Sequence, residues 1–256
     1  SSLVLRPSNS DDRYIRFDVD DPIGWRFDPE HPPFADEIRF AEVEFGGRRE
    51  LAVIPTIGSA GASPDSRWQP HLVVDRAAPA NRPMTSVLVE DTAWAGLLGF
   101  LGSRDMAVAT RLLDGGMERS VIAALEQKRA NPLAAAAAAL IAVSVAAPER
   151  DRIWDPWLRN LATWFPAMPD GAIVLARRLL TRARSAEDLA EARHWFEEGL
   201  RRGVAYYSLS VDWLARGLES LPDEDAALLD LQRAARDLAN RVDSMRTFTV
   251  VRLGHR

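Results

Sequence analysis

The sequence predicts an α+β protein: a small antiparallel β-sandwich or rolled sheet, followed by an irregular α-helical bundle or solenoid. Three observations lead to this prediction. Short apolar runs separated by turn residues fill the first third of the chain, whereas apolar residues recur at helical spacing after it. A long uncharged stretch, 130–148, lies near the middle. A run rich in β-branched residues, 247–253, lies near the C-terminus, and we expect it to return to the N-terminal sheet.

The change of period sets the expected domain boundaries. We predict an antiparallel β domain over residues 1–90, completed by the strand 247–253, and an α-helical domain over residues 91–246. With 256 residues the chain is long enough to bury a sizeable core. No residue set recurs at a fixed period, so helical pairs are expected but not a repeat array.

The uncharged stretch predicts the central helix of the bundle. Residues 132–147 have a good helix former at most positions, Pro132 suits a first turn, and Pro148 ends the helix. A helix that is apolar all round must be buried, in protein or in lipid. Its length of about 24 Å is short of a hydrocarbon core of about 30 Å. We therefore expect it to be buried in protein, where alanines let its neighbours approach closely.

The β domain has one strong local signal. Gly46-Gly47 separates the runs 38–45 and 49–54, which is typical of a two-residue hairpin. The apolar phase slips at Ala41-Glu42 and predicts a bulge. Further strands are expected over the runs 3–5, 14–19, 72–74 and 87–89.

The helical domain carries recognisable helix ends. Ser185 and Asp188 have capping-box spacing, and Gly203 is expected to end that helix. Asp155 before Pro156, Asp170, and Pro222 are read as three further helix starts. Shorter helices are expected over the segments 92–101, 104–113, 118–129 and 206–218.

Composition bounds the function. The formal charge is −5, and residues 1–90 hold ten Arg against fifteen acidic residues, which argues against a nucleic-acid surface. The chain has no cysteine, so disulfides and thiolate sites are excluded and a cytoplasmic location is expected. No signal peptide or membrane span is visible, and because the first residue is not Met we expect the chain to be a piece of something longer.

No assembled catalytic, cofactor or metal site is expected. The four histidines are dispersed along the chain, and the acidic run around Asp18–Glu30 lacks the ordered spacing of a calcium loop. A triad of Ser63 or Ser66 with His71 and Asp75 can be drawn, but neither serine has a nucleophile-elbow pattern.

Two loop tryptophans are candidates for protein contact. Trp25 and Trp68 lie in polar loops, and Asp20 and Asp21 lie close to the first of them. Exposed aromatics beside acidic residues can anchor a protein partner. The alternative is that the two tryptophans cover the bottom of the small sheet.

Several segments carry a resemblance to a known family. They are 85–89 with Trp94, Phe100–Asp105, Asn131–Ala135, Trp157–Leu161, Trp164–Pro166, Pro169–Ala172 and Arg202-Gly203. Together they resemble the non-catalytic C-terminal region appended to some bacterial caspase-like peptidases and related multidomain proteins. In that family catalysis belongs to a separate domain with a His-Cys dyad, so no catalytic residue carries over to this cysteine-free chain.

The resemblance implies an accessory module. The first hypothesis is therefore a non-enzymatic domain that binds protein and regulates or positions a fused or partner effector, such as a caspase-like peptidase. The second is a small-molecule sensor with a pocket between the sheet and the central helix. The third is a serine hydrolase that uses Ser63 or Ser66.

Overall fold

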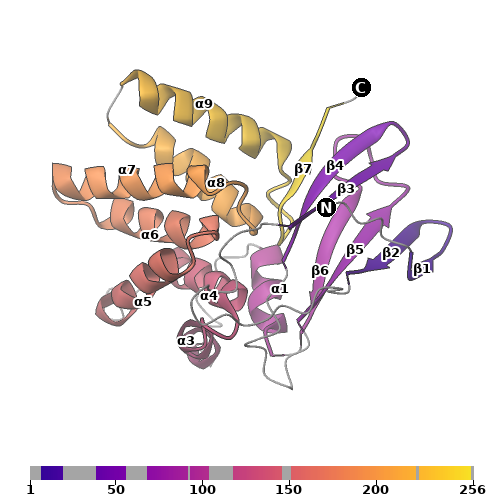
Figure 1. Cartoon of the computed structure of the whole chain (residues 1–256), viewed down its shortest axis with the longest axis horizontal. Coiled ribbons are helices and arrows are strands. Elements are labelled where there is room, and N and C mark those ends of the chain that lie inside the picture. The colour runs from indigo at the N-terminus through magenta and orange to yellow at the C-terminus, as the bar shows by residue number, and fades with distance from the viewer. Residues whose placement is uncertain are drawn as a thin grey trace.

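The structure is a computed structural model, and it describes residues 7–19, 39–55, 68–91, 93–103, 118–145, 151–222 and 225–254. The predicted α+β class is confirmed. Two antiparallel sheets lie on one side of the molecule and the helices on the other (Figure 1). The strand β7 is at the edge of its sheet, beside the helices. The predicted strand 3–5 and the predicted helix 104–113 lie outside the described residues.

The first sheet has the strand order β1-β2-β5-β6. Its strands are β1 (Asn9–Ser10), β2 (Tyr14–Asp18), β5 (Gln69–Asp75) and β6 (Thr85–Glu90). Phe17, Leu72 and Val87 are paired across the three longer strands, and the last two are buried. The predicted strands 14–19, 72–74 and 87–89 therefore correspond to β2, β5 and β6.

The second sheet has the order β3-β4-β7, with β3 (Arg39–Phe45), β4 (Arg48–Ile54) and β7 (Val250–Arg252). Gly46 and Gly47 have φ values of 58° and 74°, as the tightest hairpin turns require, which confirms the hairpin. The predicted bulge is wrong, because pairing runs without a break from Arg39 opposite Ile54 to Phe45 opposite Arg48. The apparent slip arose because Phe40 is exposed, while the small Ala41 takes the inner position beside Val43.

The predicted return of the C-terminal strand is confirmed. β7 pairs antiparallel with β4, and Leu51 lies opposite Val251. Val53 also donates its backbone N–H to Thr249 O at 3.0 Å. The chain that leaves the last helix therefore enters the second sheet and is hydrogen-bonded to β4 there.

Eight helices are assigned among the described residues. They are α1 (Ala95–Ser103), α3 (Glu118–Glu126), α4 (Pro132–Ser144), α5 (Asp151–Trp164), α6 (Pro169–Arg182), α7 (Ala186–Arg201), α8 (Ser208–Glu219) and α9 (Ala226–Arg241). Within the described part of the chain, no helix combines the length and the apolar character needed to cross a bilayer.

The helix α4 is the centre of the helical part, as predicted. Every residue from Leu133 to Ala142 is fully buried, and α4 contacts α1, α3, α5 and α6. Asn131 caps its start by accepting a hydrogen bond from the Ala134 N–H at 2.8 Å, with Pro132 in the first turn.

Helix ends were predicted with mixed success. The Ser185–Asp188 capping box is present, and Gly203, at φ 111°, follows the end of α7. Pro222 does not open the last helix; α9 begins at Ala226, and the Asp225 side chain caps it by accepting from the Leu228 N–H at 2.7 Å. An aspartate side chain can accept a hydrogen bond from an otherwise unpaired N–H group of the first turn, which a proline side chain cannot do.

Two other predicted helix starts are wrong. Pro156 lies inside α5 rather than at its first residue, because the helix already begins at Asp151. Asp170 does not cap its own helix: Met168 is the N-cap of α6, and Asp170 is one residue inside the helix, fully buried. Its carboxylate instead accepts the backbone N–H groups of Tyr206 and Tyr207, just before α8.

Candidate anion-binding cleft

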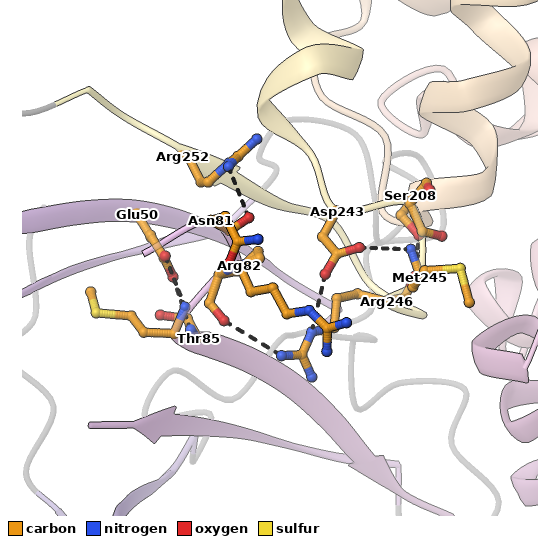
Figure 2. Close-up of polar contacts among 12 residues, drawn as sticks. Glu50, Asn81, Arg82, Thr85, Ser208, Asp243, Met245, Arg246 and Arg252 are labelled. Atoms are coloured by element: carbon orange, nitrogen blue, oxygen red, sulfur yellow. Dashed lines mark hydrogen bonds and ion pairs between the residues drawn. The ribbon is translucent and has the colours of Figure 1, made fainter. Parts of the chain in front are cut away.

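A cleft opens where the sheet part meets the helical part. It lies between the β5–β6 turn and the α9–β7 turn and has a volume of about 590 Å3 (Figure 2). Its walls are residues 81–83 of the first turn, residues 242–246 of the second, and Arg252 of β7. The return of β7 to the sheet brings these three segments together.

The β5–β6 turn is held in place by charged side chains of β4. Arg48 donates from Nη1 to Ala78 O at 3.0 Å, and its Nη2 donates to Arg82 O. The buried Glu50 carboxylate accepts the backbone N–H groups of Met84 and Thr85, both at 2.9 Å. These bonds fix the backbone of the turn and leave the Arg82 side chain exposed.

The α9–β7 turn is fixed by its own aspartate and by α8. Asp243 Oδ1 accepts the Met245 N–H at 3.0 Å, which closes a local side-chain turn. Ser208, the first residue of α8, donates its hydroxyl to Arg246 O and its N–H to Thr247 O at 3.2 Å. The turn thereby presents Met245, which is 59% exposed, and Arg246 to the cleft.

Positive charge dominates the cleft. Three arginines line it against one carboxylate, Asp243, whose Oδ2 lies 3.9 Å from Arg246 Nε. Arg252 donates to two backbone carbonyls, Asn81 O at 3.3 Å and Asn240 O at 2.9 Å. Among the residues that the structure describes, no carboxylate pairs with Arg82 or Arg252.

The arrangement suits an anion. Figure 2 shows the side chains of Arg82 and Arg246 extending toward each other across the cleft. Two like charges in one hollow repel each other, and an anion bound between them relieves that repulsion. Guanidinium groups also recognise carboxylates and phosphates through paired hydrogen bonds. An anion is therefore the chemical class of ligand that the lining of this cleft suits.

Comparison with protein families identifies the family of most of the chain. A family model described as the Y4kD C-terminal domain matches residues 96–251, which is more than half of the sequence. The chain belongs to this family. Searches of curated proteins and of solved structures gave no significant match.

The cleft crosses the boundary of the Y4kD C-terminal domain. Residues 242–246 lie within the matched region, whereas residues 81–83 and Arg252 lie outside it. The match covers every described helix apart from the first residue of α1, and it ends within β7. A complete cleft therefore needs the Y4kD C-terminal domain together with the preceding sheets.

Of the four predicted protein-contact residues, the structure describes Trp68 alone, and Trp68 does not line the cleft. Asp20, Asp21 and Trp25 fall outside the described residues. Trp68 is described, and it is only 8% exposed. Its indole N–H donates to Pro55 O at 2.6 Å, and this side chain packs into the core.

The residues considered for a triad are not joined as drawn from the sequence. The carboxylate beside His71 is Asp18, whose Oδ1 lies 2.8 Å from Nδ1, and the other ring nitrogen lies 3.6 Å from Glu90. Asp75 instead pairs with Arg13 at 3.1 Å. That hydrogen bond is the main reason why the pKa of Asp75 is lowered, and Arg246 adds a smaller effect. Ser63 and Ser66 lie outside the described residues.

Other charged clusters in the helical part have structural partners. Arg178 and Arg182 both pair with Asp155, at 3.0 and 2.8 Å, and Arg177 lies over the ring of Trp213. His194 lies on a second hollow of about 510 Å3 between α7 and the segment after α8. Within the described ranges, no group of three or more His, Asp or Glu side chains is placed to hold a metal.

The cleft arginines were missed because they are distant in sequence. Arg82 lies in a turn between two predicted strands, Arg246 immediately precedes the predicted C-terminal strand 247–253, and Arg252 lies within that strand. Each is an ordinary surface residue when read alone. The available signal was the predicted return of that strand to the sheet, which brings a second turn beside the first.

Proposed function

We propose that this chain is a non-enzymatic accessory module that binds protein, and that it regulates or positions a fused or partner effector. A caspase-like peptidase is the effector that the sequence resemblance favours. Membership of a family of C-terminal domains supports this proposal, because such a domain accompanies other parts of a longer protein. The proposed contact site is the arginine-lined cleft.

One observation carries the proposal: three arginines line the cleft against a single carboxylate, and the described lining lacks the usual side chains of acid–base chemistry. Its described walls include no histidine, and their single carboxylate is engaged with a backbone N–H and with Arg246. General acid–base catalysis needs a titratable group within reach of the reacting atoms. Electrostatic complementarity, in contrast, serves recognition.

The expected surroundings follow from composition. We propose a cytoplasmic module, because a chain without cysteine does not depend on an oxidising compartment. We propose neither a nucleic-acid nor a membrane partner, since the formal charge is −5 and the cleft is a local basic feature.

The test uses the full-length effector with its module. Effector activity and co-purification are measured with the wild-type module, with the double variant Arg82→Glu/Arg246→Glu, and with Arg233→Glu. Arg233 is an exposed residue of α9 that pairs only locally, with Asp230, among the described residues. We expect the double variant to lose capture and regulation, and Arg233→Glu to retain both. Full regulation by the double variant, with an unchanged melting temperature, would contradict this use of the cleft.

A small-molecule sensor is the second candidate. The volume of about 590 Å3 is within the usual range for small-ligand sites. The second hypothesis expected a pocket against α4, whereas this hollow lies between the two turns. The residues of α4 from Leu133 to Ala142 are fully buried by neighbouring elements. A rise in melting temperature with an anionic metabolite, lost in Arg82→Glu, would favour this candidate.

A further inference from the structure

We infer that the cleft recognises carboxylate side chains of an acidic peptide segment, in preference to a phosphate group. This inference rests on the proposed function, because it names the chemistry of the partner that the cleft contacts. It depends on three features: how the arginines are held, which end of a helix faces the cleft, and where apolar surface adjoins the charges.

The way in which the cleft arginines are hydrogen-bonded suits the binding of single carboxylates. Two backbone carbonyls orient the Arg252 guanidinium without neutralising it. The backbone of Arg82 is fixed by Arg48, while its side chain is exposed and has no partner among the described residues. A planar guanidinium with its donors available pairs with a carboxylate through two parallel hydrogen bonds. Arg82 is therefore the principal contact, and Arg246 faces it.

The helix end at the cleft disfavours concentrated negative charge. Val242, which lines the cleft, is the C-cap of α9, and the Asn240 carbonyl of its last turn faces Arg252. The C-terminal end of a helix carries a partial negative charge, whereas phosphate sites commonly use helix N-termini. Asp243 adds a full negative charge in the same wall. A dianionic phosphate meets more repulsion here than a carboxylate does.

Apolar surface beside the charges favours a peptide over a free acid. Met245, at 59% exposure, and the more buried Val242 line the same cleft as the arginines. Methionine adapts its shape to different apolar side chains. A segment in which an apolar residue stands between two acidic ones satisfies both features at once, and a free dicarboxylate satisfies only the charges.

The experiment follows the arginine Nε–Hε resonances of the ¹⁵N-labelled chain during titration. The probes are the peptide acetyl-Ala-Asp-Leu-Glu-Ala-amide, its Asn/Gln counterpart, glutarate, and inorganic phosphate. We expect the acidic peptide to shift and saturate the Arg82 and Arg246 signals, and the amide peptide to leave them unchanged. Glutarate and phosphate should each need at least about tenfold higher concentration.

Two variants sharpen the result. Arg82→Gln removes the principal contact without removing a hydrogen bond of the described fold, and it should weaken peptide binding about tenfold. Arg233→Gln is the matched control and should bind as the wild type does. The inference is overturned if phosphate or glutarate saturates as readily as the peptide, if the amide peptide binds equally well, or if no probe shifts these signals.

This outcome is separable from that of the proposed function. If Arg82→Gln abolishes peptide binding while effector regulation is unchanged, the peptide chemistry stands and the regulatory use of the cleft fails. If regulation depends on Arg82 while the cleft prefers phosphate, the proposed contact site stands and the carboxylate inference fails.

Discussion

Asp170, on α6, accepts the hydroxyl hydrogen bond of Ser210, on α8, at 2.6 Å in the fully buried interior. The same carboxylate accepts the backbone N–H groups of Tyr206 and Tyr207, at 2.8 and 3.1 Å, just before α8 begins. The N-cap residue of α8, Tyr207, forms no side-chain cap. Asp170, from a neighbouring helix, therefore accepts hydrogen bonds from backbone N–H groups at the start of α8. A negative charge at this position also interacts favourably with the positive end of the helix dipole.

This relationship makes Asp170 a determinant of stability. Asp170→Ala leaves three buried donors without their acceptor, and we expect it to lower the free energy of unfolding by about 2–4 kcal/mol. Asp170→Asn retains an acceptor oxygen and should cost less. Urea denaturation of both variants measures these differences. A cost below that of the exposed control Asp237→Ala would contradict the assigned role.

Asp170 also predicts a pH dependence. Burial raises the pKa of this carboxyl above 3.8, outweighing the hydrogen bonds from Ser210, Tyr206 and Tyr207 that lower it. A carboxyl with a higher pKa in the folded state stabilises the fold most below its unfolded pKa, and loses that contribution as the pH rises through the folded value. Wild-type stability should therefore fall relative to Asp170→Asn as the pH is raised from about 4 toward neutrality. A constant difference across this range would show that the pKa is not raised.

Trp68 predicts a change in stability rather than a loss of partner contact alone. Its side chain is buried, and its indole N–H is bonded to Pro55 O. Trp68→Ala should lower the free energy of unfolding by about 3–5 kcal/mol, measured by urea denaturation. Trp164→Ala is the matched comparison, because that ring is 41% exposed, and it should cost clearly less. Equal costs would mean that Trp68 does not belong to the core.

The architecture was predictable because its signals are local. Short apolar runs predicted β2, β5 and β6, the Gly46-Gly47 pair predicted the hairpin, and continuous apolar character predicted that α4 is buried. Errors arose where a tertiary contact overrides a local one. Asp170 has the residue type and position of a cap, but its carboxylate is used by another helix, and no periodicity reports that use.

The cleft was less predictable, since its charges come from three segments. Each of Arg82, Arg246 and Arg252 is held by backbone carbonyls or neighbouring turns that exist only after folding. Sequence patterning predicted the return of β7 but not which side chains would face each other there. Sites built from turns depend on tertiary geometry, whereas periodicity reports regular elements.

The central helix predicts a large response to a small increase in volume. Ala137 is fully buried in α4 among closely packed neighbours. Ala137→Leu should destabilise the protein by about 1–3 kcal/mol, because the extra carbons have no space. Ala234→Leu, at an exposed position of α9, is the matched control and should be nearly neutral. Urea midpoints compare the two, and a neutral Ala137→Leu would mean that α4 is loosely packed.

Two helical glycines predict opposite effects of the same substitution. A Cβ at Gly171 would lie 2.8 Å from Leu161 O, a backbone atom of α5 that cannot move without the helix. A Cβ at Gly99 of α1 would meet nothing within 4 Å. Gly171→Ala should therefore destabilise by about 1–3 kcal/mol, whereas Gly99→Ala should stabilise by up to about 1 kcal/mol through its better helix propensity. If thermal denaturation shows both variants to be stabilised, α5 and α6 are not packed as closely as the backbone distance at Gly171 requires.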